Sequence, residues 1–73
     1  DGSEIDLIIK DYEGILHPYE IKLKKRVDIS MISSFKKIGN LSNIGKGGII
    51  CLSTNLKELT SKHQIIPLSS LIL

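Results

Sequence analysis

The chain is poor in aromatic and sulfur-containing side chains. Its 73 residues include no tryptophan, one phenylalanine, two tyrosines and one cysteine, although 41% of the residues are hydrophobic. We therefore expect an aliphatic core built mainly from isoleucine and leucine. A lone cysteine excludes an internal disulfide and is typical of a protein kept in a reducing cytoplasm. Cys51 lies inside the apolar run of residues 48–52, which indicates a buried structural thiol and not a nucleophile.

Long hydrophobic runs and a strong net charge are also missing. No apolar run approaches the roughly 18 residues that a membrane-spanning helix needs, and no signal peptide is visible. We therefore expect a cytoplasmic protein without a membrane partner. The formal net charge of +2 is too small to identify a partner. No nucleotide-binding P-loop is present, so we expect no part of this chain to bind ATP.

The chain is long enough for one domain only. A domain of this size buries about 60% of the surface of its unfolded chain, so its stability is small without a partner. The sequence begins at Asp1 without a methionine and enters a predicted strand almost at once. We therefore interpret residues 1–73 as a piece of a longer protein.

The stretch at residues 4–24 predicts a β-hairpin, because two apolar-rich runs flank a polar link that contains a glycine. The expected first strand, turn and second strand cover residues 4–10, 11–14 and 15–24. Alternate residues of a strand point to the same face. Each strand then has one charged face, formed by Glu4 and Asp6 in the first strand and by Glu20 and Lys22 in the second. The opposite faces are apolar and carry Ile5, Leu7 and Ile9, and Tyr19, Ile21 and Leu23.

The two charged faces have two interpretations. If the strands pair so that these faces adjoin, the carboxylates and the ammonium converge. Such a group can hold a hard divalent cation and position a water molecule. Alternatively, the hairpin has one charged face exposed to solvent and no site. His17 and His63 carry no metal-binding spacing and are expected to be ordinary surface or turn residues.

A second group of charges follows the predicted hairpin. Lys24, Lys25 and Arg26 are consecutive, and Lys36 and Lys37 are near in sequence. A basic cluster of this kind can contact the phosphate backbone of a nucleic acid. The alternative is a solvated edge, since lysines on an outer strand also prevent strands of other molecules from pairing there.

The remaining segments predict one helix and two strands. An apolar stripe at residues 31–38 follows Asp28, a suitable N-cap, and predicts a helix. Residues 49–53 predict a central strand, residues 65–68 an edge strand because of Pro67, and residues 69–73 a last helical turn. The connection through the helix predicts that the second and third strands are parallel.

The sequence thus predicts an α+β (α/β-like) fold with a small mixed sheet, β-β-α-β-β order and one main helix packed on one face. One helix covers only one face of a sheet. We therefore expect the other face and the apolar residues 71–73 to meet a second copy of the chain in a homodimer, or another part of the protein.

Four pieces of the sequence resemble a known family. They are Glu4-Ile5-Asp6-Leu7, Tyr19-Glu20-Ile21-Lys22, the helix at residues 31–38, and Ile66-Pro67-Leu68. In this order they resemble the PD-(D/E)XK nuclease core, and more narrowly the C-terminal domain of a family of prokaryotic AAA-type ATPases. The resemblance covers nearly the whole chain. It implies a truncated restriction-endonuclease-like core, with residues 1–73 as one C-terminal domain attached to the rest of its own ATPase chain.

The resemblance also implies roles for particular residues. Asp6 and Glu20, helped by the Ile21 carbonyl, would ligate Mg²⁺, and Glu4 is a further candidate ligand. Lys22 would orient the attacking water or stabilise the charge that develops at phosphorus. Lys24, Lys25 and Arg26 would contact DNA.

The match departs from the family pattern in two places. Ile5 stands where the pattern has a proline, and the leading helix of the family is absent. Two functions therefore remain open. One is a nuclease-like domain that grips DNA or, if active, hydrolyses its phosphodiester bonds as a magnesium-dependent deoxyribonuclease. The other is a catalytically inactive docking or oligomerisation module of the ATPase.

Overall fold

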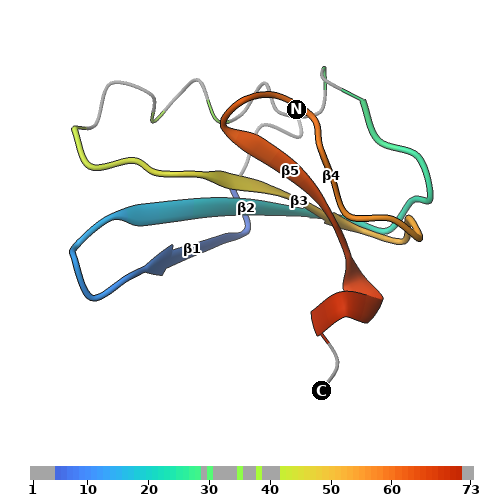
Figure 1. The fold of residues 1–73 in the computed structure, drawn as a ribbon, viewed down its shortest axis with the longest axis horizontal. Coiled ribbons are helices and arrows are strands. Elements are labelled where there is room, and N and C mark those ends of the chain that lie inside the picture. Colours follow the sequence, from blue (N-terminus) through green and yellow to red (C-terminus); the bar gives the residue numbers. More distant parts are fainter. Residues whose placement is uncertain (1–4, 29, 31–34, 36–37, 39–41, 72–73) are drawn as a thin grey trace.

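The described part of the chain forms a mixed sheet of five strands (Figure 1). The computed structural model describes residues 5–28, 30, 35, 38 and 42–71. The strands lie in the order β1-β2-β3-β5-β4. Their bounds are β1 Leu7–Lys10, β2 Leu16–Lys22, β3 Gly47–Cys51, β4 Lys57–Glu58 and β5 His63–Pro67, and the 3-10 helix η2 Leu68–Leu71 follows. In the described part of the chain, no helix has the length and apolar character needed to cross a membrane.

The predicted hairpin is confirmed by the antiparallel pairing of β1 with β2, from Leu7 opposite Tyr19 to Lys10 opposite Leu16. Its turn is held by Asp11, whose Oδ1 accepts hydrogen bonds from the backbone N–H groups of Glu13 and Ile15. Gly14 completes the turn with a φ of 85°, a left-handed conformation that residues with a Cβ adopt at a cost.

The third strand is central, as predicted. It lies between β2 and β5, is parallel to both, and all five of its residues are buried. It begins at Gly47, two residues earlier than expected, because the neighbouring backbones approach closely there. A Cβ on Gly47 would meet the carbonyl oxygen of Pro18, and one on Gly48 would meet that of Gln64.

The prediction of an edge strand near Pro67 is wrong. β5 has β3 on one side and β4 on the other, where Lys57 pairs with Ile65 and Glu58 pairs with Gln64. Proline marks an edge because it lacks a backbone N–H. β4 is only two residues long and ends its pairing at Ile65, so the missing N–H of Pro67 disturbs no bond on that side.

The predicted α+β fold with one main helix, in a truncated restriction-endonuclease-like core, is wrong as well. The described residues hold no helix of seven residues or more. Most of the helix expected at residues 31–38 lies outside the described residues. Phe35 is described and is buried, and its ring stacks on His63 with 4.8 Å between ring centroids. The apolar stripe thus identified a residue that packs on the sheet. A stripe this short does not determine helical geometry, because helices below about 12 residues depend on tertiary packing.

Burial differs between the two faces of the sheet. The strand registers place Glu20, Ile49 and Ile65 in one row across what we call the covered face. Val27 and Leu59 pack against its core cluster, which consists of Ile49, Cys51 and Ile65. On the other face, at the β1–β2 side, Leu7, Ile9 and Ile21 are 40%, 49% and 45% exposed, and we call these three residues the open patch.

Candidate functional site

The predicted acidic and basic residues of β2 form an ion pair on the covered face. The Lys22 Nζ lies 3.0 Å from Oε1 of Glu20, two residues earlier on the same strand. The Glu20 side chain is 3% exposed and the Lys22 side chain is 30% exposed. A buried carboxylate is costly unless it is paired, so Lys22 compensates the charge that the fold buries. The alternative interpretation, in which the charged face of the hairpin is exposed to solvent, does not apply to Glu20.

Asp6 reaches the same stretch of β2 from the residue before β1. Its Oδ2 accepts a hydrogen bond of 2.8 Å from the backbone N–H of Ile21, and its own N–H donates to the Tyr19 carbonyl at 3.1 Å. The carboxylate therefore replaces a backbone carbonyl at the end of the antiparallel ladder. This bond engages one carboxylate oxygen and holds Asp6 beside the residue that separates Glu20 from Lys22.

The structure thus brings Asp6, Glu20, Ile21 and Lys22 to one end of the hairpin. Glu4 lies outside the described residues. Across those that are described, no group of three or more His, Cys, Asp or Glu side chains is arranged to hold a metal ion. The predicted ligand set has only two carboxylates and one carbonyl. Oxygen ligands of this kind suit Mg²⁺, which keeps several of its own waters and takes one or two carboxylates.

The predicted DNA-contacting residues lie in the exposed segment after β2. The Lys24 carbonyl accepts the N–H of Leu52 at 2.9 Å, which joins this segment to the one after β3. Lys25 and Arg26 line two adjoining hollows together with Lys57 of β4. Lys57 was missed from the sequence, because it is distant from the basic cluster and no motif marks it.

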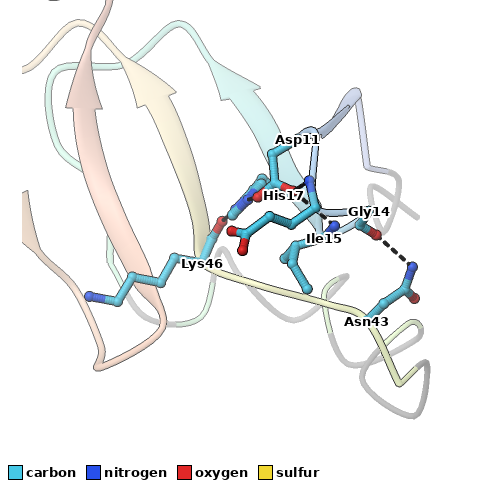
Figure 2. A network of polar contacts seen from close by, with 7 residues as sticks. Asp11, Gly14, Ile15, His17, Asn43 and Lys46 are labelled. Atoms are coloured by element: carbon cyan, nitrogen blue, oxygen red, sulfur yellow. Dashed lines mark hydrogen bonds and ion pairs between the residues drawn. The ribbon is translucent and has the colours of Figure 1, made fainter.

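A polar network at the opposite end of the hairpin was also missed (Figure 2). The Nδ1 of His17 lies 2.6 Å from the carbonyl oxygen of Lys46, and its Nε2 lies 2.8 Å from Oδ2 of Asp11. Both partners only accept hydrogen bonds, so this arrangement suits the doubly protonated imidazolium ring. Nearby, the Asn43 amide donates to the Gly14 carbonyl at 3.0 Å.

His17 therefore connects three segments and is not the ordinary surface or turn residue that we expected. The hydrogen bond that His17 donates to the Asp11 carboxylate, followed by the one to the Lys46 carbonyl, raises the pKa of His17 above its usual 6.5. The same contact with His17 is the main cause of the lowered pKa of Asp11. Because both ring nitrogens are engaged, the residue joins the hairpin turn to the segment before β3.

His63 has a different environment, as the first residue of β5 and not the loop residue we expected. Its ring stacks on Phe35, and its Nδ1 lies 2.8 Å from the hydroxyl of Thr60. Burial, followed by the charge of Lys62, lowers the pKa of His63 below 6.5. Burial disfavours the charged ring, so His63 is held in its neutral form near neutral pH.

These features describe a small mixed-sheet domain with an ion pair buried at one end of its hairpin. A family model described as Domain of unknown function (DUF4143) matches residues 1–71. The chain belongs to this family, a domain found in AAA-ATPase-associated proteins. No curated protein and no solved structure matches the chain.

Proposed function

We propose that the chain is a nuclease-like domain with a site of the PD-(D/E)XK type, which binds DNA and hydrolyses phosphodiester bonds with the help of Mg²⁺. The observation that supports this proposal is the position of the Asp6 carboxylate. It is bonded to the N–H of Ile21, directly between the buried Glu20 and Lys22. Two carboxylates, a carbonyl and an ammonium thus share one end of the hairpin.

Each of these groups has a role in the proposed site. The second oxygen of Asp6, a carboxylate oxygen of Glu20 and the Ile21 carbonyl would hold the metal ion. Bound Mg²⁺ polarises a phosphoryl oxygen and lowers the pKa of a coordinated water. Lys22, whose side chain is 30% exposed, turns from Glu20 toward the scissile phosphate and stabilises the negative charge that develops there.

Calorimetric titration with Mg²⁺ or Mn²⁺ tests the metal site. The test variant is Asp6→Asn/Glu20→Gln, which keeps an acceptor for the Ile21 N–H and the size of both side chains but removes both charges. The matched control is Glu58→Gln, an exposed carboxylate on β4. We expect saturable heats from the unaltered chain and the control, and none from the double variant. Equal, negligible heats from all three proteins would contradict the proposed metal site.

A second candidate function is a catalytically inactive docking or oligomerisation module of the ATPase. The observation that favours it is the open patch, which lies on the end strand β1 and its neighbour β2. Within the described residues, the outer edge of β1 has no partner strand. A second copy that pairs its own β1 there would extend the sheet and bring two open patches together across a twofold axis.

Sedimentation velocity at several protein concentrations tests this second candidate. We expect the unaltered chain to associate as its concentration rises, and Ile9→Lys to remain monomeric. Lys10→Gln, on the same strand, is the matched control and should still associate. A monomer at every concentration would exclude the homodimer.

A further inference from the structure

Two adjoining hollows lie at the carboxyl ends of β2 and β3. These two ends are at the same edge of the sheet because the strands are parallel. The volumes of the hollows are about 270 and 280 Å³. The residues that line both are Lys25, Arg26, Ser53 and Lys57. Leu52, Thr54 and Asn55 complete the first hollow, and Val27 and Ile65 complete the second. Since four residues are common to both, we treat them as one feature and call it the basic hollow.

The charge of the basic hollow is one-sided. Three cations line it, from two segments that are about thirty residues apart in the sequence. Neither of its halves has an aspartate or glutamate among the described residues that line it. Like charges that converge without a counter-charge repel one another, and an anion relieves that repulsion. Ser53, Thr54 and Asn55 add hydroxyl and amide donors beside the cations.

The backbone around the basic hollow is held by the sheet. The N–H of Leu52 donates to the Lys24 carbonyl, which joins the segment after β2 to the segment after β3. Val27 packs on the core cluster, and Lys57 is held opposite Ile65 by the pairing of β4 with β5. The cations therefore line the basic hollow from segments that are joined to the sheet, together with the apolar residues Val27 and Ile65.

The position and the size of the basic hollow both suit a phosphate group. Ligands of open sheets with parallel strands commonly bind outside the carboxyl ends of those strands. A water molecule takes about 30 Å³ of liquid volume, so either half of the basic hollow has room for a phosphate with several waters. An arginine guanidinium can bind two phosphate oxygens at once, and lysines add point charges around it.

We propose that the basic hollow binds backbone phosphates of a nucleic-acid strand through Lys25, Arg26 and Lys57. The nucleic-acid identity of the ligand depends on the proposed function, whereas the binding itself needs no metal ion. Lys57 distinguishes the basic hollow from the run of basic residues at positions 24–26, because it comes from a distant part of the sequence. It contributes only because the fold brings β4 beside the segment after β2.

The test is fluorescence anisotropy with labelled single-stranded and duplex oligonucleotides, in EDTA, over a series of salt concentrations. The variants are Lys57→Gln and Lys25→Gln/Arg26→Gln, and the matched control is Lys10→Gln on β1, an exposed lysine that is not in the basic hollow. We expect each cation removed from the basic hollow to weaken binding. It should also reduce the slope of log affinity against log salt by about 0.7 to 0.9. Lys10→Gln should leave both unchanged.

Three outcomes would overturn the proposal. One is no binding of any oligonucleotide in EDTA. Another is an equal loss of affinity from Lys57→Gln and Lys10→Gln. The third is binding to phosphatidylserine vesicles without binding to oligonucleotides, which would make the ligand a lipid surface. Because EDTA removes metal ions, the anisotropy measurement reports on the basic hollow and the calorimetric titration reports on the metal site, so failure of the metal site and failure of the basic hollow are distinguishable.

Discussion

Neighbouring residues of β2 have opposite environments on the two faces of the sheet. Glu20 is 2% exposed, whereas Ile21 is 45% exposed and Leu23 is 70% exposed. The usual expectation for an alternating strand is that the aliphatic side is buried and the charged side is solvated. Here the charged side of β2 is the one that is covered. The comparison teaches that alternation shows which residues share a face and does not show which face is covered.

The cover accounts for this inversion. Val27 and Leu59 pack on the side of the sheet where Ile49 and Ile65 lie, and the strand registers place Glu20 in that row. Burial of the Glu20 carboxylate costs less free energy because the ammonium of Lys22, two residues later in the strand, forms an ion pair with it. The predictions that follow test this difference between the faces, beginning with the largest effect.

Truncation at the centre of the covered face should have the largest effect. Ile49 is fully buried, so Ile49→Ala should reduce the free energy of unfolding by about 2 to 5 kcal/mol. Ile21→Ala, on the open patch, should cost about 1 kcal/mol or less because its side chain is half exposed. Urea denaturation measures both. If the alanine variant of Ile49 does not fold, Ile49→Val should still cost about 0.5 to 1.5 kcal/mol. Equal losses at the two positions would contradict the difference between the faces.

Removal of the ammonium from the buried ion pair should have the next largest effect. Lys22→Met leaves the Glu20 charge buried without this partner and should cost about 1 to 3 kcal/mol. A second change, Glu20→Gln, should recover part of that loss. A double-mutant cycle from urea denaturation measures the coupling. Strictly additive effects would show that the two side chains do not interact.

The hydrogen bond that the Asp6 carboxylate accepts from the Ile21 N–H allows a structural role of Asp6 to be separated from a metal-binding role. Asp6→Ala removes the acceptor of the Ile21 N–H and should cost about 1 kcal/mol of stability without any metal. Asp6→Asn keeps an acceptor and should cost less. The measurement is urea denaturation in EDTA. If the two variants were equally destabilised, the hydrogen bond would not contribute.

The ionisation of the two histidines should have the smallest effects on stability. The effect of His17 and that of His63 depend on pH in opposite directions. His17 is in register with Ile9 of the open patch, and His63 is in register with Gly47 of the central strand. The pKa of His17 is raised, so its contribution to stability is complete below pH 6.5 and is lost as pH rises through the folded-state pKa. The pKa of His63 is lowered, so its contribution is present above pH 6.5 and is lost as pH falls below that value.

Titration of the histidine ring protons by NMR measures both pKa values directly. We expect His17 to titrate above 6.5 and His63 below it. His17→Gln should remove the loss of stability on the alkaline side and leave the loss caused by His63 just below pH 6.5 in place. Titration of both rings at the same pH would contradict the different environments.

Local patterns were sufficient to predict several elements. The hairpin followed from two apolar runs around a glycine-containing link, and the central strand followed from the continuous apolar run that contains Cys51. The parallel pairing of β2 with β3 was predicted from a connection through a helix, and the pairing is confirmed although most of that helix lies outside the described residues. Each of these inferences depends on residues close together in the sequence or on a topological rule that applies to every chain.

Long-range features could not be predicted in the same way. β4 has two residues and exists through its pairing with β5, so no local pattern marks it. His17 looked unremarkable because its second partner, the carbonyl of Lys46, is a backbone group 29 residues away. The apolar stripe around Phe35 correctly predicted that this residue packs, whereas most of the helix predicted at residues 31–38 lies outside the described residues. At the candidate site, Glu20 and Lys22 could be paired from their spacing, whereas Lys57 could not be placed near Arg26.

The sequence by itself determined which side chains of each strand lie together, because backbone pleating imposes a period of two on any strand. Only the tertiary structure decided which side is covered, because that depends on where the connections between strands pack. The burial of Glu20, the exposure of Ile21 and the meeting of Lys57 with Lys25 and Arg26 all follow from that packing.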